Sequence, residues 1–379
     1  MQTKDSVDDH HLGNVRFELD ISFISAEMNN SSASSFTNHS LEPMKNNLLF
    51  EKLRDRMRRR LNPALRKVQP FSFNFTQVED VAITNGLQRG KECYDPFDVK
   101  ISYNHQCILV SAHEAQSIQV FDLQTRKLQF SISTGYLNPC YMAIEENYST
   151  SSKNRKYSDA LLLNECESHY CNGYLCKYDL ESLLELQQTM TNSQYNRSWI
   201  WKADGLEFPE QAIVVYSIHS ENMIYVCDSG STCVRVISAN SGTTLSTLSF
   251  ETPIHHPYGL LFTNQGDLLI SQGSEANRIE LFRKNENSAN WKCIKTLQNK
   301  GAETCFVNAF YLHHEKETDH IIVSACDDNE LQVFTNDGTF VKSCKIDTPS
   351  WSPIGICLNE LTGELYVCGN NRAAVRIYK

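Results

Sequence analysis

The chain has 379 residues, of which 41% are hydrophobic and 21% charged, a composition that excludes wholesale disorder and can supply a sizeable core. The formal net charge is −10, and the acidity is concentrated in residues 71–379, which hold 24 Lys and Arg against 36 Asp and Glu. So acidic a region is a poor general binder of phosphate groups, which disfavours nucleic acid as the ligand.

The start of the chain and its cysteines indicate a compartment. Residues 1–15 contain no apolar segment of the kind that a secretory signal needs, and no run of about 18 apolar residues occurs anywhere. The 14 cysteines are scattered through apolar runs such as Cys107–Val110, which is typical of reduced cysteine used as a small hydrophobic residue. We therefore expect a cytoplasmic protein, with a nuclear location as the alternative, and neither a disulfide scaffold nor a transmembrane segment.

Two segments precede the main domain. Residues 1–46 are rich in Ser, Asn, Asp and His, which predicts a disordered tail. Residues 47–70 carry apolar side chains at spacings of three or four with basic residues between them, which predicts a basic amphipathic helix. Arg58, Arg59 and Arg60 of this helix could bind RNA, an anionic membrane or an acidic groove, or act as a nuclear-import signal. Alternatively, the helix docks its apolar side onto the rest of the chain.

From Phe71 onward, short strand-like runs recur with a period of roughly 40–50 residues, which is typical of repeat architectures. Each unit opens with a similar phrase, whose anchor positions are Pro96, Pro139, Pro209, Pro257, Phe306 and Pro353. An apolar strand, an alternating strand and a weaker fourth strand follow in each unit. Six units of four antiparallel strands predict an all-β, six-bladed β-propeller over residues 71–379, because one such sheet must stack on its neighbours to cover both faces.

Two irregularities in the repeats have local explanations. The second unit is long because it contains a polar loop before Tyr157 and, at Leu180–Met190, a short predicted helix after its third strand. The last unit ends after its third strand at Lys379, whereas Phe71–Val78 is a strand-like segment ahead of the first unit. We expect residues 71–78 to be the closing strand of the last blade, since this removes the open edge of the array.

Three of these phrases resemble the NHL repeat. His256–Phe262 has the P-x-G pattern, Ile224–Ile237 has the Y-V-x-D-S-G pattern followed by V-R-V, and Ser352–Cys357 with Leu365–Tyr378 is a third match. The chain departs from the pattern where Ser111, Ser271 and Ser324 stand in place of a carboxylate like Asp228, and where the fifth unit lacks its proline. The WD-type propeller is the alternative, but no Trp-Asp pair ends a strand and no Gly-His pair opens a unit.

Cysteine and histidine together invite a zinc interpretation in the segment that contains Cys166, His169, Cys171 and Cys176. The spacing is not that of a zinc finger, and ordinary residues of a β-hairpin are the simpler interpretation. His255 and His256 enter the fourth unit at the mouth of the propeller axis, where metal-dependent lyases and hydrolases of related propellers hold their ligands. No matching ligands recur in the other units, so we expect no cofactor and no stoichiometric metal.

Function is instead expected on the face where the loops between blades and the hairpins between second and third strands converge. Exposed aromatic residues and arginine on a rigid rim are the side chains that dominate binding energy at protein interfaces. The candidate partner-binding residues on these loops are Tyr94, Tyr136, Asn138, His255, His256, Tyr258, Trp351 and Arg372.

The resemblance implies two functions, because NHL propellers serve as recognition modules of ubiquitin ligases or as RNA-binding domains. No RING-like array of C-x-x-C pairs precedes the propeller, so ligase activity of the chain itself is not expected. The acidic balance disfavours RNA. We therefore expect a monomeric, non-enzymatic scaffold that binds a protein partner through the loop face, with an RNA-binding NHL propeller and a metal-dependent lyase or hydrolase as alternatives.

Overall fold

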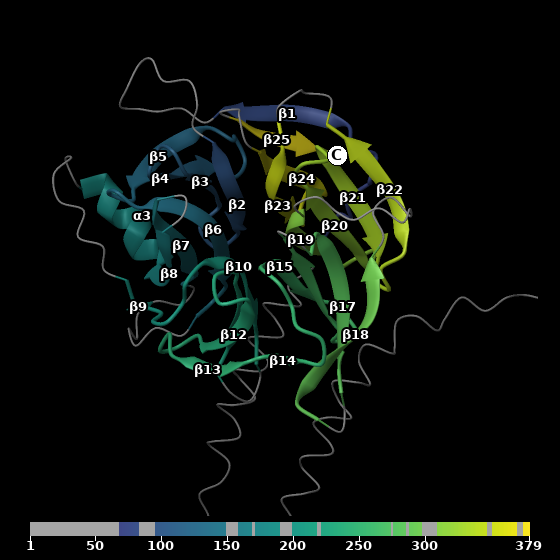
Figure 1. The fold of residues 1–379 in the computed structure, drawn as a ribbon. Coiled ribbons are helices and arrows are strands. Elements are labelled where there is room, and N and C mark those ends of the chain that lie inside the picture. Colours follow the sequence, from purple (N-terminus) through teal and green to yellow (C-terminus); the bar gives the residue numbers. More distant parts are fainter. Residues whose placement is uncertain are drawn as a thin grey trace, which may run out of the picture. The chain divides into compact units, whose positions relative to one another are not determined.

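The computed structural model describes residues 68–82, 95–148, 158–168, 171–189, 199–217, 221–273, 276–285, 288–297, 309–346, 351–369 and 374–379. Within this part of the chain, six sheets surround a common centre, so the predicted all-β, six-bladed propeller is confirmed (Figure 1). The predicted tail, residues 1–46, and nearly all of the predicted basic helix lie outside the described residues.

Five of the six blades are built from consecutive strands, ordered from the centre outward. Blade one contains β2 (Pro96–Ser102), β3 (Cys107–Ala112), β4 (Ser117–Asp122) and β5 (Leu128–Ser133), and blade two contains β6 (Asn138–Glu145), β7 (Ala160–Ser168), β8 (Cys171–Asp179) and β9 (Trp201–Lys202). Blade three contains β10 (Pro209–Val215), β11 (Met223–Asp228), β12 (Cys233–Ser238) and β13 (Thr244–Thr247), and blade four contains β15 (Pro257–Phe262), β16 (Leu268–Gln272), β17 (Arg278–Lys284) and β18 (Asn290–Leu297). Blade five contains β19 (Ala309–Glu315), β20 (His320–Ala325), β21 (Glu330–Thr335) and β22 (Phe340–Lys345), and blade six contains β23 (Pro353–Asn359), β24 (Glu364–Gly369), β25 (Ala374–Tyr378) and β1 (Gln77–Ala82). The predicted helix in blade two is α3 (Leu180–Thr189).

The inner strands β2, β6, β10, β15, β19 and β23 lie nearest the centre, and each contacts the inner strand on either side, so the ring is closed (Figure 1). Each inner strand begins with an irregular register, as between Pro96 and Asp98 in blade one. Such a bulge leaves backbone groups unpaired. In blade one, the hydroxyl of Ser111 on β3 accepts the Asp98 amide at 2.9 Å. In blades four and five, the corresponding hydroxyls of Ser271 and Ser324 accept the amides of Gly259 and Tyr311 on their own inner strands.

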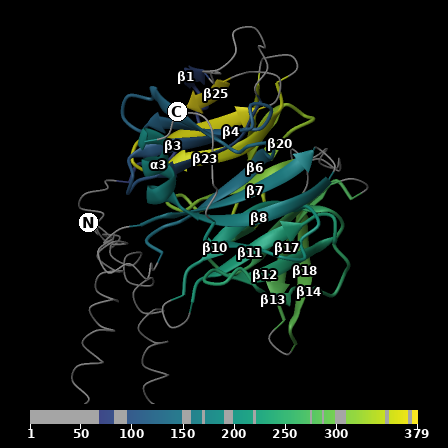
Figure 2. The ribbon, with the colours of Figure 1, turned by 90° about the vertical axis from the view of Figure 1, so that its left-hand side faces the viewer.

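The N-terminal segment closes the ring with a shift from its predicted position. The closing strand is β1, residues 77–82, which pairs antiparallel with β25, and Figure 2 shows the two strands side by side. Residues 71–76 are not a strand, because Phe73 and Phe75 adopt left-handed backbone angles, with φ of 57° and 54°. Their rings instead pack edge-on against the buried ring of Phe71, at centroid distances of 5.0 and 5.1 Å. This aromatic group joins the core cluster that lies between blades five and six.

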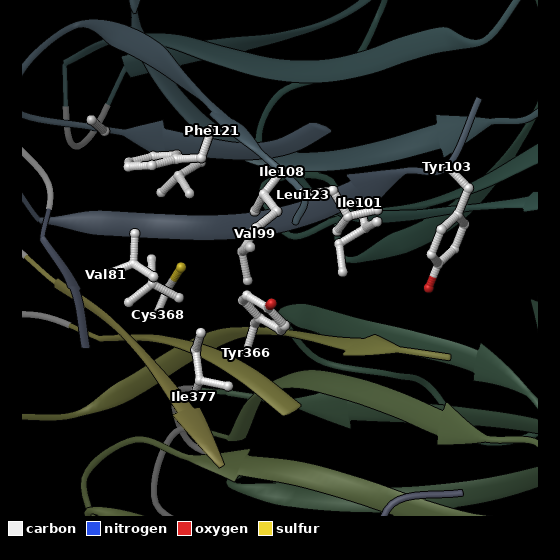
Figure 3. Close-up of a cluster of buried hydrophobic side chains, with 13 residues drawn as sticks. Val81, Val99, Ile101, Tyr103, Ile108, Phe121, Leu123, Tyr366, Cys368 and Ile377 are labelled. Carbon is white, nitrogen blue, oxygen red and sulfur yellow. The ribbon is translucent and has the colours of Figure 1, made fainter. Parts of the chain in front are cut away.

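Neighbouring blades are held together by apolar layers. The layer between blades six and one contains Val99 and Ile108 from blade one, Tyr366 and Ile377 from blade six, and Val81 from β1 (Figure 3). All five side chains are buried. Because β1 contributes to this layer as well as to the sheet, both the strand pairing and the side chains of the N-terminal segment stabilise the closed ring.

Blade four has a fifth strand that the sequence did not predict. The stretch that follows β12 is not one fourth strand but splits at Leu248 into β13 and the two-residue β14 (Ser249–Phe250). β14 pairs parallel with β18, and the Phe250 ring packs at 4.9 Å on Phe282 of blade four. The chain thus leaves blade three at Leu248, and the partly buried Phe250 packs against blade four.

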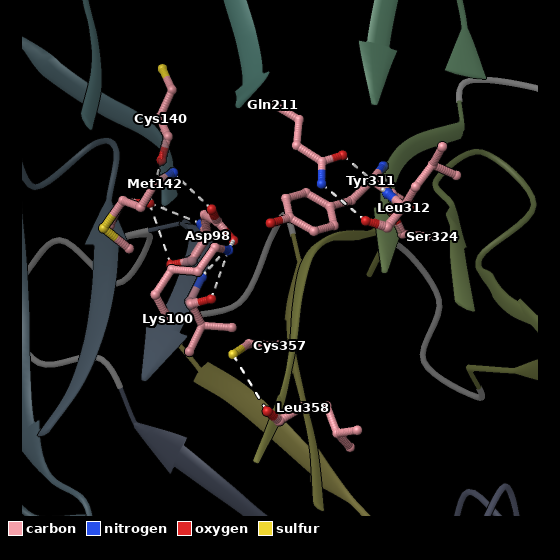
Figure 4. A network of polar contacts seen from close by, with 12 residues as sticks. Asp98, Lys100, Cys140, Met142, Gln211, Tyr311, Leu312, Ser324, Cys357 and Leu358 are labelled. Carbon is pink, nitrogen blue, oxygen red and sulfur yellow. Dashed lines mark hydrogen bonds and ion pairs between the residues drawn. The ribbon is translucent and has the colours of Figure 1, made fainter. Parts of the chain in front are cut away.

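A network of polar and aromatic contacts joins the inner strands (Figure 4). The carboxylate of Asp98 accepts the amides of Val99 and Met142 at 2.8 Å and the ammonium of Lys100 at 2.6 Å. Lys100 also lies over the ring of Tyr311, at 4.6 Å from its centroid. The amide of Met142 is on β6, so Asp98 satisfies the inward edge of the neighbouring blade, which has no further strand to pair with.

Opposing effects act on this buried ion pair. Burial lowers the pKa of Lys100, but the charge of Asp98, the hydrogen bond to it, and the Tyr311 and Cys357 groups together outweigh burial and raise the Lys100 pKa above its ordinary value. Burial raises the pKa of Asp98 above its ordinary value, although Lys100 and the two amides lower it in part. With three donors converging on the carboxylate, we assign Asp98 as ionised. His313 also lies at the axis, and burial together with the Lys100 charge lowers the pKa of its imidazole to about 3, so that it is neutral.

A second bridge runs from β10 to the inner strands of blades four and five. The side-chain amide of Gln211 donates to the Leu312 carbonyl at 2.9 Å, and its oxygen accepts the amides of Leu260 and Leu312. The glycines of the P-x-G phrases make room for these bridges. A Cβ on Gly355 would lie 2.6 Å from an oxygen of Asp98, and one on Gly259 would lie 3.0 Å from the oxygen of Gln211. The glycine of the P-x-G phrase is thus required in these two blades because a side chain there would collide with Asp98 or Gln211.

Candidate functional site

The loop face is defined here as the end of the propeller at which the inner strands begin. Its described segments are residues 95, 113–116, 134–137, 203–208, 229–232, 251–256, 273 with 276–277, 326–329 and 351–352. In three blades, the first residue after the second strand donates its amide to the residue before the inner-strand proline. The pairs are His113 to Asp95, Ser229 to Phe208 and Gly273 to His256, at 2.9–3.2 Å. These bonds fix the hairpins against the entry loops, so the rim is held on rigid strands.

Tyr136 is the most prominent of the predicted binding residues. It lies on the loop between β5 and β6, and 84% of its surface is exposed. The side-chain amide of Gln116 donates to the Tyr136 carbonyl at 3.3 Å and to the side-chain oxygen of Asn138 at 3.1 Å. Gln116 belongs to the β3–β4 hairpin, so this part of the rim is braced between blades one and two. Tyr136 and Asn138 are therefore presented together on a supported loop.

The second group of predicted residues belongs to blade four. His255 and His256 are both exposed, and His256, with φ of 41°, has its Nδ1 3.1 Å from the Ser229 carbonyl of blade three. Tyr258 is half-buried, and its ring packs on Phe310 of blade five with the centroids 5.0 Å apart. His256 and Tyr258 contact neighbouring blades, and all three residues retain exposed surface, which suits a preformed contact area.

Trp351 does not belong to the surface. Its side chain is completely buried, and the guanidinium of Arg376 lies over the ring at 4.5 Å. The adjacent Gly369 has no side chain, and a Cβ there would lie 2.5 Å from the indole. The predicted role of Trp351 in binding is thus corrected to one in the core, because the indole fills the space beside this glycine. Tyr94, Arg372, Arg58, Arg59 and Arg60 lie outside the described residues.

The charge of the loop face is negative over its described part. None of the described segments that define this face contains a lysine or arginine. These segments carry seven carboxylates: Asp95, Glu114, Asp204, Glu207, Glu251, Asp327 and Asp328. Such a surface attracts cations and repels phosphate groups.

Asp228, the carboxylate of the best NHL match, has a structural role. It accepts the amides of Glu207 and Phe208 at 3.1 and 2.9 Å and pairs with Arg235 at 3.0 Å. The strand register also corrects the alignment in which Ser111, Ser271 and Ser324 stood in the position of Asp228. Asp228 lies opposite Pro209, and the residues opposite the equivalent Pro96 and Pro257 are Ala112 and Gln272 rather than the serines. In blade two the residue in this position, opposite Pro139, is Glu165, which is a carboxylate.

The structure brings together three residues that sequence spacing did not connect. Cys166 lies with Cys140 and His113, and one ligand atom from each of the three falls within 4.8 Å of the other two. His169 and the side chain of Cys171 lie outside what the structure describes, and Cys176 is buried in the core between blades one and two. Cys140 directly follows the inner-strand proline, and Cys166 ends the part of β7 that pairs with β6, so aligning the blades would have placed both at the same end of one sheet.

Glu210 occupies on β10 the position that Cys140 occupies on β6, one residue after the inner-strand proline. Burial raises the pKa of Glu210 to about 8, and the nearby Cys166 thiol adds to this rise. The Ser229 hydroxyl, which donates a 2.9 Å hydrogen bond to the Glu210 carboxylate, acts in the opposite direction and lowers the pKa. The hydrogen bond with Cys166 and burial raise the pKa of Cys140. At neutral pH, without another ligand, these groups are therefore largely protonated.

Comparisons with known proteins add little beyond the fold. No protein-family model matches the chain, and no curated protein matches it. Among solved structures, the chain is similar to the WD40 β-propeller domain of Doa1, with 11% identity, coverage of 74% of this chain and 77% of that one, and a TM-score of 0.47. No helix in the described part of the chain is both long and apolar enough to cross a membrane. The six-bladed fold follows from the sheet topology of the chain itself, and its assignment to the NHL family stays a prediction.

Proposed function

We propose that the chain is a non-enzymatic recognition module that binds a protein partner through the loop face. The observation that carries this proposal is the exposure of Tyr136 on a loop braced by Gln116, beside Asn138. A large aromatic side chain held on a rigid loop loses little conformational entropy when it binds, which makes it a natural anchor. His255, His256 and Tyr258 provide a second contact area on the same face.

The chemistry of the surface selects the kind of partner. The carboxylates of the loop face favour a basic or uncharged protein segment over RNA. The NHL-type glycines beside Asp98 and Gln211, and the bonds from Asp228 to the entry loop, support assigning the blades to the NHL type. The partner hypothesis that goes with this family is that the chain serves as the substrate-recognition component of a ubiquitin-ligase-type assembly.

Replacement of Tyr136 by alanine tests the proposal. We expect the variant to weaken partner binding by about 2 kcal/mol, or roughly 30-fold in Kd, because a hot-spot aromatic contributes on this scale. The partner is first identified by affinity purification with the full chain, and Kd is then measured by titration calorimetry. The matched control is Trp199→Ala, which removes a 48% exposed aromatic side chain two residues before the outer strand of blade two.

Salt dependence separates this proposal from its competitor. Binding that survives Tyr136→Ala but falls steeply with salt and is abolished by replacing Arg58, Arg59 and Arg60 would contradict a site on the loop face. It would place the site on the N-terminal basic segment. Equal losses in Tyr136→Ala and Trp199→Ala would likewise count against the proposal.

A further inference from the structure

We propose that His113, Cys140 and Cys166 bind one zinc ion. The three residues come from the β3–β4 hairpin, from β6 and from β7, and they lie where blades one and two meet at the loop face. This assignment is the opposite of the expectation drawn from spacing, since no two of the three belong to one short motif. It does not rest on the proposed recognition function, because zinc content is measured without a partner.

The distances suit the metal. The Cys140 and Cys166 sulfurs are 3.5 Å apart, and the Cys166 sulfur is 3.9 Å from His113 Nε2. Around a tetrahedral zinc with Zn–S near 2.3 Å and Zn–N near 2.0 Å, two sulfurs lie about 3.8 Å apart and a sulfur and a nitrogen about 3.5 Å apart. The two sulfurs and the Cys166–His113 pair are within about 0.4 Å of these separations, and the ligand atoms of Cys140 and His113 lie within 4.8 Å of each other. Shifts of about 1 Å or less would therefore complete three corners of the tetrahedron.

The backbone holds the two sulfurs together. Asn138 is the cross-strand partner of Cys166, and the register shift between Pro139 and Met142 lies around Cys140. Both thiols donate to the Asn138 carbonyl at 3.7 Å. A zinc ion would replace the two thiol protons, and the thiolates would then coordinate the metal directly.

The imidazole of His113 is also positioned. It is 4% exposed, and the ring of Phe97 stacks on it with the centroids 5.4 Å apart. With Nε2 directed to Cys166, the other nitrogen, Nδ1, lies 3.7 Å from a carboxylate oxygen of Glu114. A carboxylate behind the second nitrogen of a ligating histidine is a recurrent feature of zinc sites, because it fixes the tautomer and raises the basicity of the ligand.

The chemistry of the ligands selects zinc among common cations. Two thiolates and an imidazole are soft and borderline donors, which disfavours magnesium and calcium. Three protein ligands leave a fourth position for water or for a group from outside the chain.

Metal analysis of the full chain tests the assignment. Protein purified under reducing conditions without chelator should contain one equivalent of zinc. Cys140→Ser, Cys166→Ser and His113→Asn should each lose it. The matched control is Cys344→Ser on β22, a partly buried cysteine of blade five, which should retain the metal. Wild-type protein without zinc that also fails to take up added Zn²⁺ or Co²⁺ would overturn the proposal, as would equal zinc content in all the variants.

A second measurement needs no substitution and therefore does not depend on whether the variants fold. In the wild-type protein, zinc should protect Cys140 and Cys166 from alkylation, as measured by mass spectrometry of peptides, and a chelator should remove that protection. The rate of Cys344 alkylation should stay the same with and without chelator. Alkylation of Cys140 and Cys166 at the same rate in both conditions, or recovery of the two residues as a disulfide in freshly reduced protein that binds no zinc, would contradict the site.

Discussion

Removal of residues 68–82 should destabilise the propeller more than any single substitution. A chain that begins at residue 83 lacks β1, the outer strand of blade six, and Val81 in the layer between blades six and one. It also lacks the buried ring of Phe71. Losing one buried phenylalanine costs about 3–5 kcal/mol, and exposure of the edge of β25 adds to this. We therefore expect the midpoint of thermal unfolding to fall by roughly 10 °C or more.

The comparison is with a chain that begins at residue 68. The two proteins differ only in the segment under test, so the tail and the basic segment cannot account for the difference. If the shorter chain does not fold, Phe71→Ala in the full chain gives the same information and should cost about 3–5 kcal/mol. Val78→Ala, on a β1 side chain that is 50% exposed, should change stability by less than about 0.5 kcal/mol. Equal melting of the chains that begin at residues 68 and 83 would show that the ring is not closed by this segment.

Asp98→Asn should destabilise the protein by about 3–5 kcal/mol, because it leaves the Lys100 ammonium in the interior without its counter-charge. Asp98 is fully buried, and it also accepts the Met142 amide of the neighbouring blade. The free energy of unfolding is measured by urea denaturation. Asp337→Asn is the control, because its 3.9 Å ion pair with Lys295 is exposed and should contribute less than about 1 kcal/mol.

A double variant isolates the charge from the packing. Asp98→Asn combined with Lys100→Met removes both charges and should recover much of the stability that Asp98→Asn alone loses. If Asp98→Asn is as stable as the wild type, the pair does not stabilise the axis. If the double variant is no better than the single one, the loss comes from the hydrogen bond to Met142 rather than from the unpaired ammonium.

The blades could be predicted from the sequence because their signals are local. Pro96, Pro209, Pro257 and Pro353 begin the inner strands β2, β10, β15 and β23 as the phrases indicated. Proline is tolerated there because the first residue of a strand at the sheet edge has no ladder bond to donate. The closing strand was displaced because the alternation of Phe71, Phe73 and Phe75 resembles a strand, and only the left-handed backbone angles of the last two residues show otherwise.

The site was harder to predict because it depends on contacts between residues that are far apart in the sequence. Nothing in the sequence around Trp351 distinguishes an indole on a loop tip from one packed beside Gly369. Likewise, His113, Cys140 and Cys166 come from three separate segments and meet only when blades one and two stack. The exposure of Tyr136, in contrast, follows from its place in a turn between strands, which the repeat pattern already located.

Hydrogen–deuterium exchange of the full chain, with and without its purified protein partner, tests most directly whether the loop face is the recognition surface. We predict slower exchange of amides in residues 113–116, 134–137 and 229–232, which lie on the loop face, when the partner is bound. Residues 123–127, 263–267 and 335–339 lie at the opposite end of the blades and should exchange at unchanged rates. Protection confined to the opposite end, or to residues 47–67, would contradict recognition through the loop face.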